Sequence, residues 1–326
     1  MTTFSDEYNK KVKFILSYDE FFINMASLYY PFNKNQLRKY KSILDWKTIC
    51  GNSEIEWTLD LIIEFEELLT DKEENKFDWQ FQTNEGVEWS YDLIKYFHSK
   101  WEWEYLAQNS SFMSNKECCN LFQNELLQYF ETIEKLIDTS NYFTDGAYAV
   151  LNDANRNVNE MLKHKEFQIQ TIQEIDKTEK IDFKYLSQNE ILPWSEELLD
   201  KYSEKWFWNC ISSNQSIPWN LTLLKKYESK LLWFKRTEYW LDCVSANLNI
   251  KWDSELLKEF HKKIAPVNVS VSHHTCWTID LLWEFSQFWE YATLSHNVVI
   301  WEKVFNEFNS EKSINEIFDL YLKMRD

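Results

Sequence analysis

An asparagine recurs along this chain about every 25 residues, and its neighbours recur with it. An apolar residue stands three positions before it, and a tryptophan usually stands five positions after it. Because a repeated unit must bury its apolar face against adjacent units, this feature restricts the chain to a stack of similar elements. The reference positions are Asn52, Asn84, Asn109, Asn189, Asn214, Asn247, Ser272 and Asn297.

Each unit predicts two helices. The residue after the Trp is Thr, Ser, Asn or Asp, which are favoured at helix N-caps. Apolar residues follow the cap at helical spacing, as Leu198, Leu199 and Tyr202 follow Ser195, so this helix has one buried stripe. The segment before the Asn predicts a second, shorter helix that ends at the Asn, because Asn tolerates the left-handed conformation. The residue two positions before the Asn is small, and we expect neighbouring backbones to approach closely there. The predicted fold is all-α, an α-solenoid of short helical hairpins.

The pattern divides the chain into four segments of one continuous body. Residues 1–44 do not match the repeat and form a predicted N-terminal helical cap. Residues 45–119 are repeat units. Residues 120–180 are an irregular helical insertion or degenerate repeats, and the sequence leaves both interpretations open. Residues 181–326 are repeat units and a C-terminal cap, with a closing helix over 314–324.

The Trp-rich unit resembles the short tandem helical repeats, about 25 residues long, of bacterial proteins whose function is largely uncharacterised. The resemblance covers roughly residues 45–119 and 181–308. It implies a helical array and supplies no catalytic residues.

The sequence contains no motif that predicts catalysis or metal binding. Only three glycines and four prolines occur, which argues against β-rich folds and Gly-rich phosphate loops. The segment 153–164 begins like a calcium loop, but Val158 and His164 stand where Gly and Glu are needed. The histidines and cysteine of 273–276, with His261 upstream, lack the spacing of a zinc site. We therefore expect a protein that is not an enzyme and has no cofactor and no metal.

The net charge of −18 limits the partners. Nucleic acids and anionic membranes bind through Lys and Arg, so neither is an expected partner. The chain has no apolar run long enough for a transmembrane helix, and residues 1–13 do not resemble a signal peptide. We expect a cytoplasmic protein.

The remaining function is protein binding. The most concrete hypothesis is a non-catalytic, acidic immunity-type protein that neutralises a cognate bacterial toxin with a basic domain. A general scaffold or regulator, in which acidity serves only solubility, is the alternative, and an enzyme accessory subunit is a third. Tryptophans outside the repeat position are either exposed interface anchors or packed between units. The candidate partner-binding residues are Glu64, Glu66, Glu67, Asp71, Glu73, Glu74, Trp101, Trp206 and Trp233.

Overall fold

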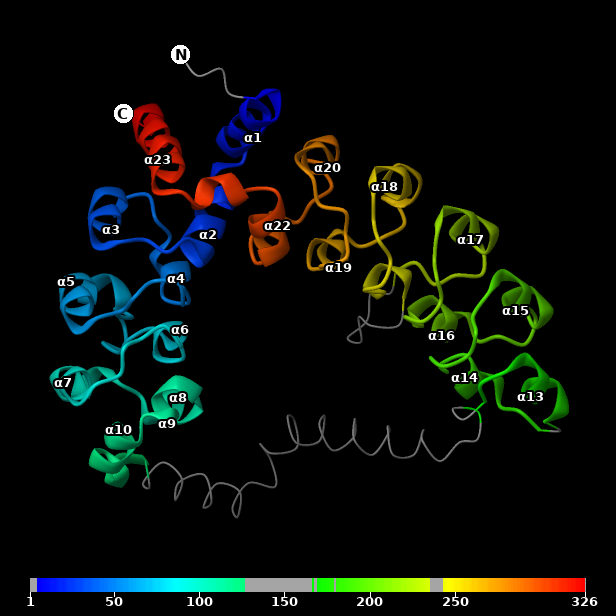
Figure 1. Cartoon of the computed structure of the whole chain (residues 1–326), viewed down its shortest axis with the longest axis horizontal. Coiled ribbons are helices and arrows are strands. Elements are labelled where there is room, and N and C mark those ends of the chain that lie inside the picture. Colours follow the sequence, from blue (N-terminus) through cyan, green and yellow to red (C-terminus); the bar gives the residue numbers. More distant parts are fainter. Residues whose placement is uncertain (1–4, 127–165, 167–168, 179, 235–242, 326) are drawn as a thin grey trace. The chain divides into compact units, whose positions relative to one another are not determined.

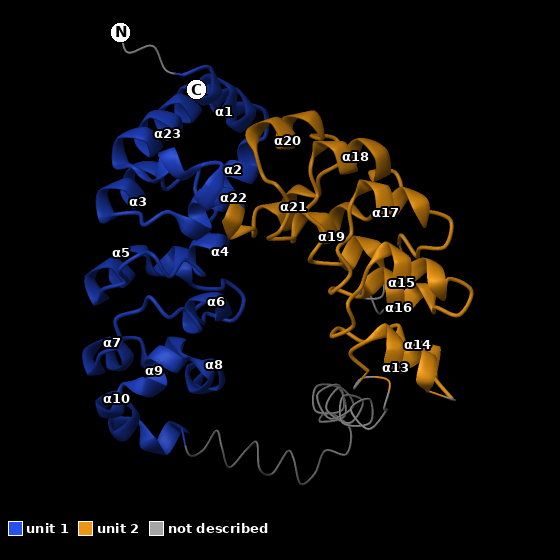
Figure 2. Ribbon diagram, turned by 45° about the vertical axis from the view of Figure 1, so that its right-hand side comes forward, with its two compact units in different colours: residues 1–141, 300–326 blue, residues 142–299 orange. Residues whose placement is uncertain are grey.

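The computed structural model describes residues 5–126, 166, 169–178, 180–234 and 243–325. Within these residues the regular secondary structure is helical, apart from two isolated β-bridges, so the all-α prediction is confirmed for them. The chain divides into two compact units (Figure 2): unit 1 comprises residues 1–141 and 300–326, and unit 2 comprises residues 142–299. Most of the ambiguous segment 120–180, including residues 153–164, lies outside the described residues.

Unit 1 contains both ends of the chain and the first repeats. Helices that follow a repeat Trp, here called post-Trp helices, lie in one row, and helices that precede a repeat Asn, here called pre-Asn helices, lie in a second row (Figure 1). The elements are α1 (Asp6–Ser17), α2 (Asp19–Tyr29), α3 (Lys34–Tyr40), α4 (Trp46–Ile49), α5 (Leu59–Leu69), α6 (Trp79–Gln82), α7 (Tyr91–Tyr96), the 3-10 helix His98–Lys100, α8 (Trp103–Gln108), α9 (Ser110–Ser114), α10 (Lys116–Leu121), α22 (Val298–Lys303), at which the chain returns from unit 2, the 3-10 helix Asn306–Asn309 and α23 (Glu311–Arg325).

Unit 2 repeats the same two-row arrangement (Figure 1). Its elements are α13 (Ile172–Lys177), α14 (Phe183–Leu186), α15 (Glu196–Lys201), α16 (Trp208–Ser213), α17 (Leu221–Lys226), the 3-10 helix Val244–Ala246, α18 (Ser254–Phe260), α19 (Pro266–Ser270), α20 (Ile279–Glu284) and α21 (Tyr291–Leu294).

The residues predicted to cap the post-Trp helices occupy the N-cap positions. Ser195 accepts a hydrogen bond from the Leu198 N–H, which satisfies one of the free donors of the first helical turn. Thr58 occupies the same position but makes no side-chain capping bond. The other four caps also accept from the residue three positions on: Ser90, Asn220, Asp253 and Thr278.

The repeat asparagines form a ladder of buried hydrogen bonds between units. The Asn214 Nδ2 donates to the Ser187 carbonyl at 3.0 Å and to the Asn189 carbonyl at 3.1 Å, both in the preceding unit. The Asn214 Oδ1 accepts from the Ser216 N–H at 2.9 Å, so both ends of the amide are used. We call this the asparagine ladder. The same double donation to the preceding unit is made by Asn84, Asn109, Asn247 and Asn297.

The predicted left-handed backbone of these asparagines is wrong. Asn75 is the one non-glycine residue with positive φ among the described residues, and Asn214 has the extended values φ −64° and ψ 114°. The side-chain amide explains the residue type, because each unit must satisfy carbonyls of the unit before it.

The small residue two positions before the Asn also links units. The Ser212 hydroxyl accepts from the Leu232 N–H at 2.9 Å, and it donates to the Trp208 carbonyl at 2.6 Å. Ser187 and Ser245 accept in the same way from the main chain of the following unit. The small serine side chain thus allows the next repeat to approach closely and accepts a hydrogen bond from its main chain.

The asparagine ladder also includes segments that precede the first repeat in each unit and do not match the repeat in sequence. Asn52 donates to the Ser27 and Tyr30 carbonyls, so α2 occupies the place of a pre-Asn helix. In unit 2, Asn189 donates to the Glu166 and Ile169 carbonyls. Residues 166 and 169–178 therefore contact the first repeat of unit 2 as a preceding repeat would.

The two ends of the chain share one aromatic core in unit 1. Phe318 of α23 is fully buried, and its ring centroid lies 4.9 Å from that of Tyr40 and 5.8 Å from that of Phe32. Phe305 packs on Phe22 at 5.6 Å. The predicted N-terminal cap and the closing helix are consequently parts of a single packed cluster.

Candidate functional site

The predicted acidic block separates into paired and unpaired carboxylates. Glu64 accepts hydrogen bonds from the Arg38 guanidinium and lies 3.0 Å from the Lys34 ammonium. These contacts, the Arg38 hydrogen bond foremost, lower the pKa of Glu64 to about 2. Glu66 lies 3.2 Å from Lys100. Two carboxylates of the block are therefore engaged within unit 1.

The rest of the block lies around a turn after α5. Asp71 accepts the main-chain N–H groups of Glu73 and Glu74 at 2.8 and 3.1 Å, which lowers the pKa of Asp71. The side chains of Glu67, Glu73 and Glu74 are exposed and have no ion-pair partner in the described part of the chain.

The candidate tryptophans pack between elements. Trp101 is 2% exposed and packs against Phe77, and Trp206 is 5% exposed and donates its indole N–H to the Leu199 carbonyl. Of the two interpretations that the sequence left open, the structure shows packing between elements for both Trp101 and Trp206. Trp233 is half-buried and stacks on Phe260 with a centroid distance of 4.5 Å.

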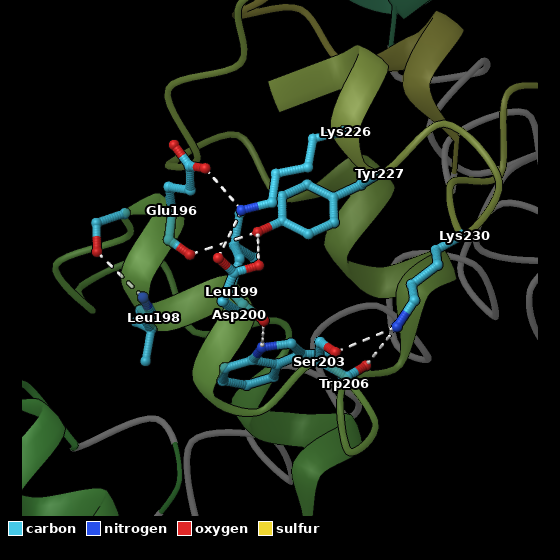
Figure 3. A network of polar contacts seen from close by, with 10 residues as sticks. Glu196, Leu198, Leu199, Asp200, Ser203, Trp206, Lys226, Tyr227 and Lys230 are labelled. Atoms are coloured by element: carbon cyan, nitrogen blue, oxygen red, sulfur yellow. Dashed lines mark hydrogen bonds and ion pairs between the residues drawn. The ribbon is translucent and has the colours of Figure 1, made fainter. Parts of the chain in front are cut away.

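The lysines of α15, α17 and α18 pair with acids of the preceding or the following helix in the same row. Lys226 of α17 lies 2.5 Å from Asp200 and 2.6 Å from Glu196, both associated with α15, while the Tyr227 hydroxyl donates to Asp200 at 2.8 Å (Figure 3). The Lys226 and Tyr227 hydrogen bonds lower the pKa of Asp200. Burial, followed by the bond to Asp200, raises the pKa of Tyr227 to about 12. The same arrangement occurs twice more. Lys201 and Tyr202 both donate to Asp176, and Lys39 and Tyr40 both donate to Asp319.

The last of these triads places α23 in the repeat arrangement of unit 1. Asp319 of α23 contacts Lys39 and Tyr40 of α3 as Asp200 of α15 contacts the pair on α17. The C-terminal helix thus takes the position of a post-Trp helix that precedes α3.

Unpaired carboxylates gather instead on the loops that join Asn to Trp in unit 1. Glu56 and Glu88 stand four positions after Asn52 and Asn84, so they are equivalent residues of two successive units. Both are exposed, and no ion pair joins either of them to a described residue. Glu54 of the same loop and one acid in the first turn of each following helix, α5 and α7, are also exposed and outside ion pairs within the described residues. We call this set the acidic loop edge: Glu54, Glu56, Asp60, Glu88 and Asp92. The sequence interpretation missed this set, although the recurrence of Glu at the fourth position after the Asn was a visible signal.

The same loops have a different character in unit 2. A groove of about 660 Å³ opens between residues 215–222 of one repeat and residues 249–256 of the next repeat. We call it the unit 2 groove. Amide and hydroxyl side chains line it together with Trp219, which is 8% exposed and whose indole N–H has no hydrogen-bond partner among the described residues. Within the described residues this groove and the acidic loop edge are separate surfaces, one in each unit.

Metal ligands do not cluster in the part of the chain that the structure describes. No group of three or more His, Cys, Asp or Glu side chains there could hold a metal ion. His273 lines a pocket of about 510 Å³ with His296, beside apolar residues of the loop before it and of α21. None of the described helices is both long and apolar enough to cross a membrane.

Comparison with known proteins gives no relative from which a site could be transferred. No protein-family model, curated protein or solved structure matches the chain. The functional argument therefore rests on the geometry of the two surfaces.

Proposed function

We propose that this chain is a non-catalytic protein-binding protein, built as an α-solenoid and acting in the cytoplasm. In its most concrete form the proposal is an acidic immunity-type protein that neutralises a basic bacterial toxin. The solenoid part is supported by the asparagine ladder, in which each unit uses the same side chain to satisfy the unit before it.

The acidic loop edge is the observation that carries the functional part. Acids on the post-Trp helices of unit 2 are largely neutralised by lysines, as Asp200 is by Lys226. Glu56 and Glu88 have no such partner in the described structure and stand at equivalent positions of adjacent units. Unpaired charge of one sign along an edge attracts a partner of opposite charge and raises its association rate.

A scaffold that assembles more than one partner is the second candidate. The unit 2 groove favours it, because the groove is polar and mixed in charge, with Lys251, Asp253 and Glu255 in its lining. A surface of this kind does not select for a basic partner by long-range attraction. Two surfaces of different chemistry could engage two different proteins.

Capture of the partner from the native host tests the proposal. The double variant Glu56→Gln with Glu88→Gln removes two charges from the acidic loop edge. The double variant Glu190→Gln with Glu197→Gln removes two exposed, unpaired charges from unit 2 and is the matched control. We expect one stoichiometric basic protein whose capture weakens with salt and in the first variant, and not in the control. Several substoichiometric partners with no such dependence would favour the scaffold.

A further inference from the structure

The loops between Asn and Trp are joined to one another in some pairs of units. The Glu88 N–H donates to the Trp57 carbonyl at 3.2 Å, and the Cys276 N–H donates to the Trp252 carbonyl at 2.8 Å. In both pairs the donor stands four positions after the reference residue of its unit. The acceptor is the repeat Trp of the unit before it.

The equivalent pair at the unit 2 groove lacks this bond. Lys251 stands four positions after Asn247, and its expected acceptor is the carbonyl of Trp219. No hydrogen bond within the described structure uses the Lys251 N–H or the Trp219 carbonyl oxygen. Both residues line the groove, so the missing bridge leaves a main-chain donor and a main-chain acceptor beside the same opening.

The residue two positions after the reference residue differs among these pairs. In the Trp57–Glu88 pair this residue is Gly86, and a Cβ atom there would lie 2.4 Å from the Ser53 carbonyl oxygen, whereas in the Trp252–Cys276 pair it is His274. At the unit 2 groove the equivalent residue is Asn249, whose side-chain amide donates to the Gln215 carbonyl at 2.7 Å. The Asn249 side chain therefore joins the two loops where the main-chain bond between Lys251 and Trp219 is missing.

From this arrangement we propose that the unit 2 groove binds an extended peptide segment of a protein partner, which supplies the missing bridge. A carbonyl of the peptide accepts from the Lys251 N–H, and an N–H of the peptide donates to the Trp219 carbonyl. This is the main-chain recognition by which an added strand pairs with an exposed edge. Free side-chain amides and hydroxyls in the lining, including Gln215, Ser216 and Thr222, can bond the remaining peptide groups.

A sugar is a poorer fit to the groove than a peptide. Carbohydrate sites usually offer an aromatic face to the ring, and Trp219, the one aromatic residue in the lining, is 8% exposed. The groove instead offers one donor and one acceptor of the main chain, which match the alternating groups of an extended peptide.

The repeat itself supplies a variant that removes the main-chain donor. Pro193 and Pro218 occupy the position of Lys251 in two other units. The turn is the same in all three, because the Trp N–H donates to the residue two before it at 2.8 Å in Trp194 and Trp219 and at 3.0 Å in Trp252. Lys251→Pro is therefore compatible with the backbone and deletes only the N–H and the charge. Lys251→Ala deletes the charge alone and is the matched control.

The test selects short random peptides displayed on phage against the full-length wild-type protein. The selected peptides are then measured by calorimetry on wild type, Lys251→Ala and Lys251→Pro, after thermal unfolding shows that the two variants are equally stable. We expect about tenfold weaker binding to Lys251→Pro than to Lys251→Ala. Equal binding to the two variants, or a selection that yields no binding peptide, would overturn the inference.

The inference rests on the proposed function, because the segment belongs to a protein partner, but the two fail separately. The peptide assay needs no cognate partner and reports on the groove alone. Capture of a basic partner that depends on Glu56 and Glu88, without any effect of Lys251→Pro, would leave the proposed function standing and remove the groove from it.

Discussion

Replacing an asparagine of the ladder should destabilise the protein. The loss should depend on how many of the buried main-chain carbonyls that it bonded are left with no hydrogen-bond donor. In Asn214→Ala the Asn189 carbonyl keeps a hydrogen bond from the Trp194 indole N–H at 2.8 Å, whereas the Ser187 carbonyl keeps none among the described residues. One orphaned buried carbonyl costs about 1–3 kcal/mol, and the lost bond from the Ser216 N–H adds about 1 kcal/mol. We expect a loss of about 2–4 kcal/mol in the free energy of unfolding.

Asn109→Ala should cost more, because neither of its two acceptors has a second donor among the described residues. The Asn109 amide donates to the Gln82 and Asn84 carbonyls, both at 3.1 Å, and the Trp89 indole N–H has no partner in the structure as described. The second orphaned carbonyl adds about 1–3 kcal/mol to the loss. Asn109 also caps α9 through the Phe112 N–H, which adds about 1 kcal/mol.

Urea unfolding followed by circular dichroism and tryptophan fluorescence measures both variants, with Gln215→Ala as an exposed control expected to change stability by less than about 0.5 kcal/mol. Coincidence of the two probes checks that one transition is being compared. Asn214→Ala indistinguishable from Gln215→Ala, or Asn109→Ala milder than Asn214→Ala, would refute the reasoning from orphaned carbonyls.

Two further predictions concern unit 1. Phe318→Ala removes a fully buried ring that packs between the two ends of the chain, and it should lower the free energy of unfolding in urea by about 3–5 kcal/mol. The control Leu320→Ala changes a residue that is 37% exposed and should have little effect. Equal effects of the two variants would contradict a core shared by the two ends. Arg38→Gln should raise the pKa of Glu64 from about 2 toward its usual 4.5 in a carboxyl NMR titration. Because the pKa of Glu64 is lower in the folded state, the stabilisation of the fold by this carboxylate is complete above pH 4.5 and is lost as pH falls through about 2. An unchanged titration in Arg38→Gln would exclude the Arg38 ion pair as the cause of the lowered pKa.

Local chemistry made part of the fold predictable from the sequence. A cap such as Ser195 acts on an N–H three residues away, and the apolar positions after it fix which face is buried. The role of Asn214 was not predictable in the same way. Its acceptors lie 25 and 27 residues earlier in the chain, so the local preference for a left-handed helix end gave the wrong backbone conformation.

The joining of the chain ends and the two candidate surfaces depend on contacts still more distant in sequence. Asp319 meets Lys39 across 280 residues, and no repeat signature marks α23 as a partner of α3. The unit 2 groove depends on a hydrogen bond that is missing between Trp219 and Lys251, and a sequence pattern does not show which bonds are made. The acidic block was visible as composition, but only the structure shows that Glu64 is paired while Glu56 is not.

Salt-dependent capture of the natural partner tests the central claim most directly. The tagged wild type and the variant Glu56→Gln with Glu88→Gln are drawn from the native host at low and at high salt, and copurifying proteins are identified by mass spectrometry. The account predicts one stoichiometric, basic protein that is bound at low salt, released at high salt and weakened by the double variant. A partner held equally at both salt concentrations and by both proteins, or no stoichiometric partner, would contradict it.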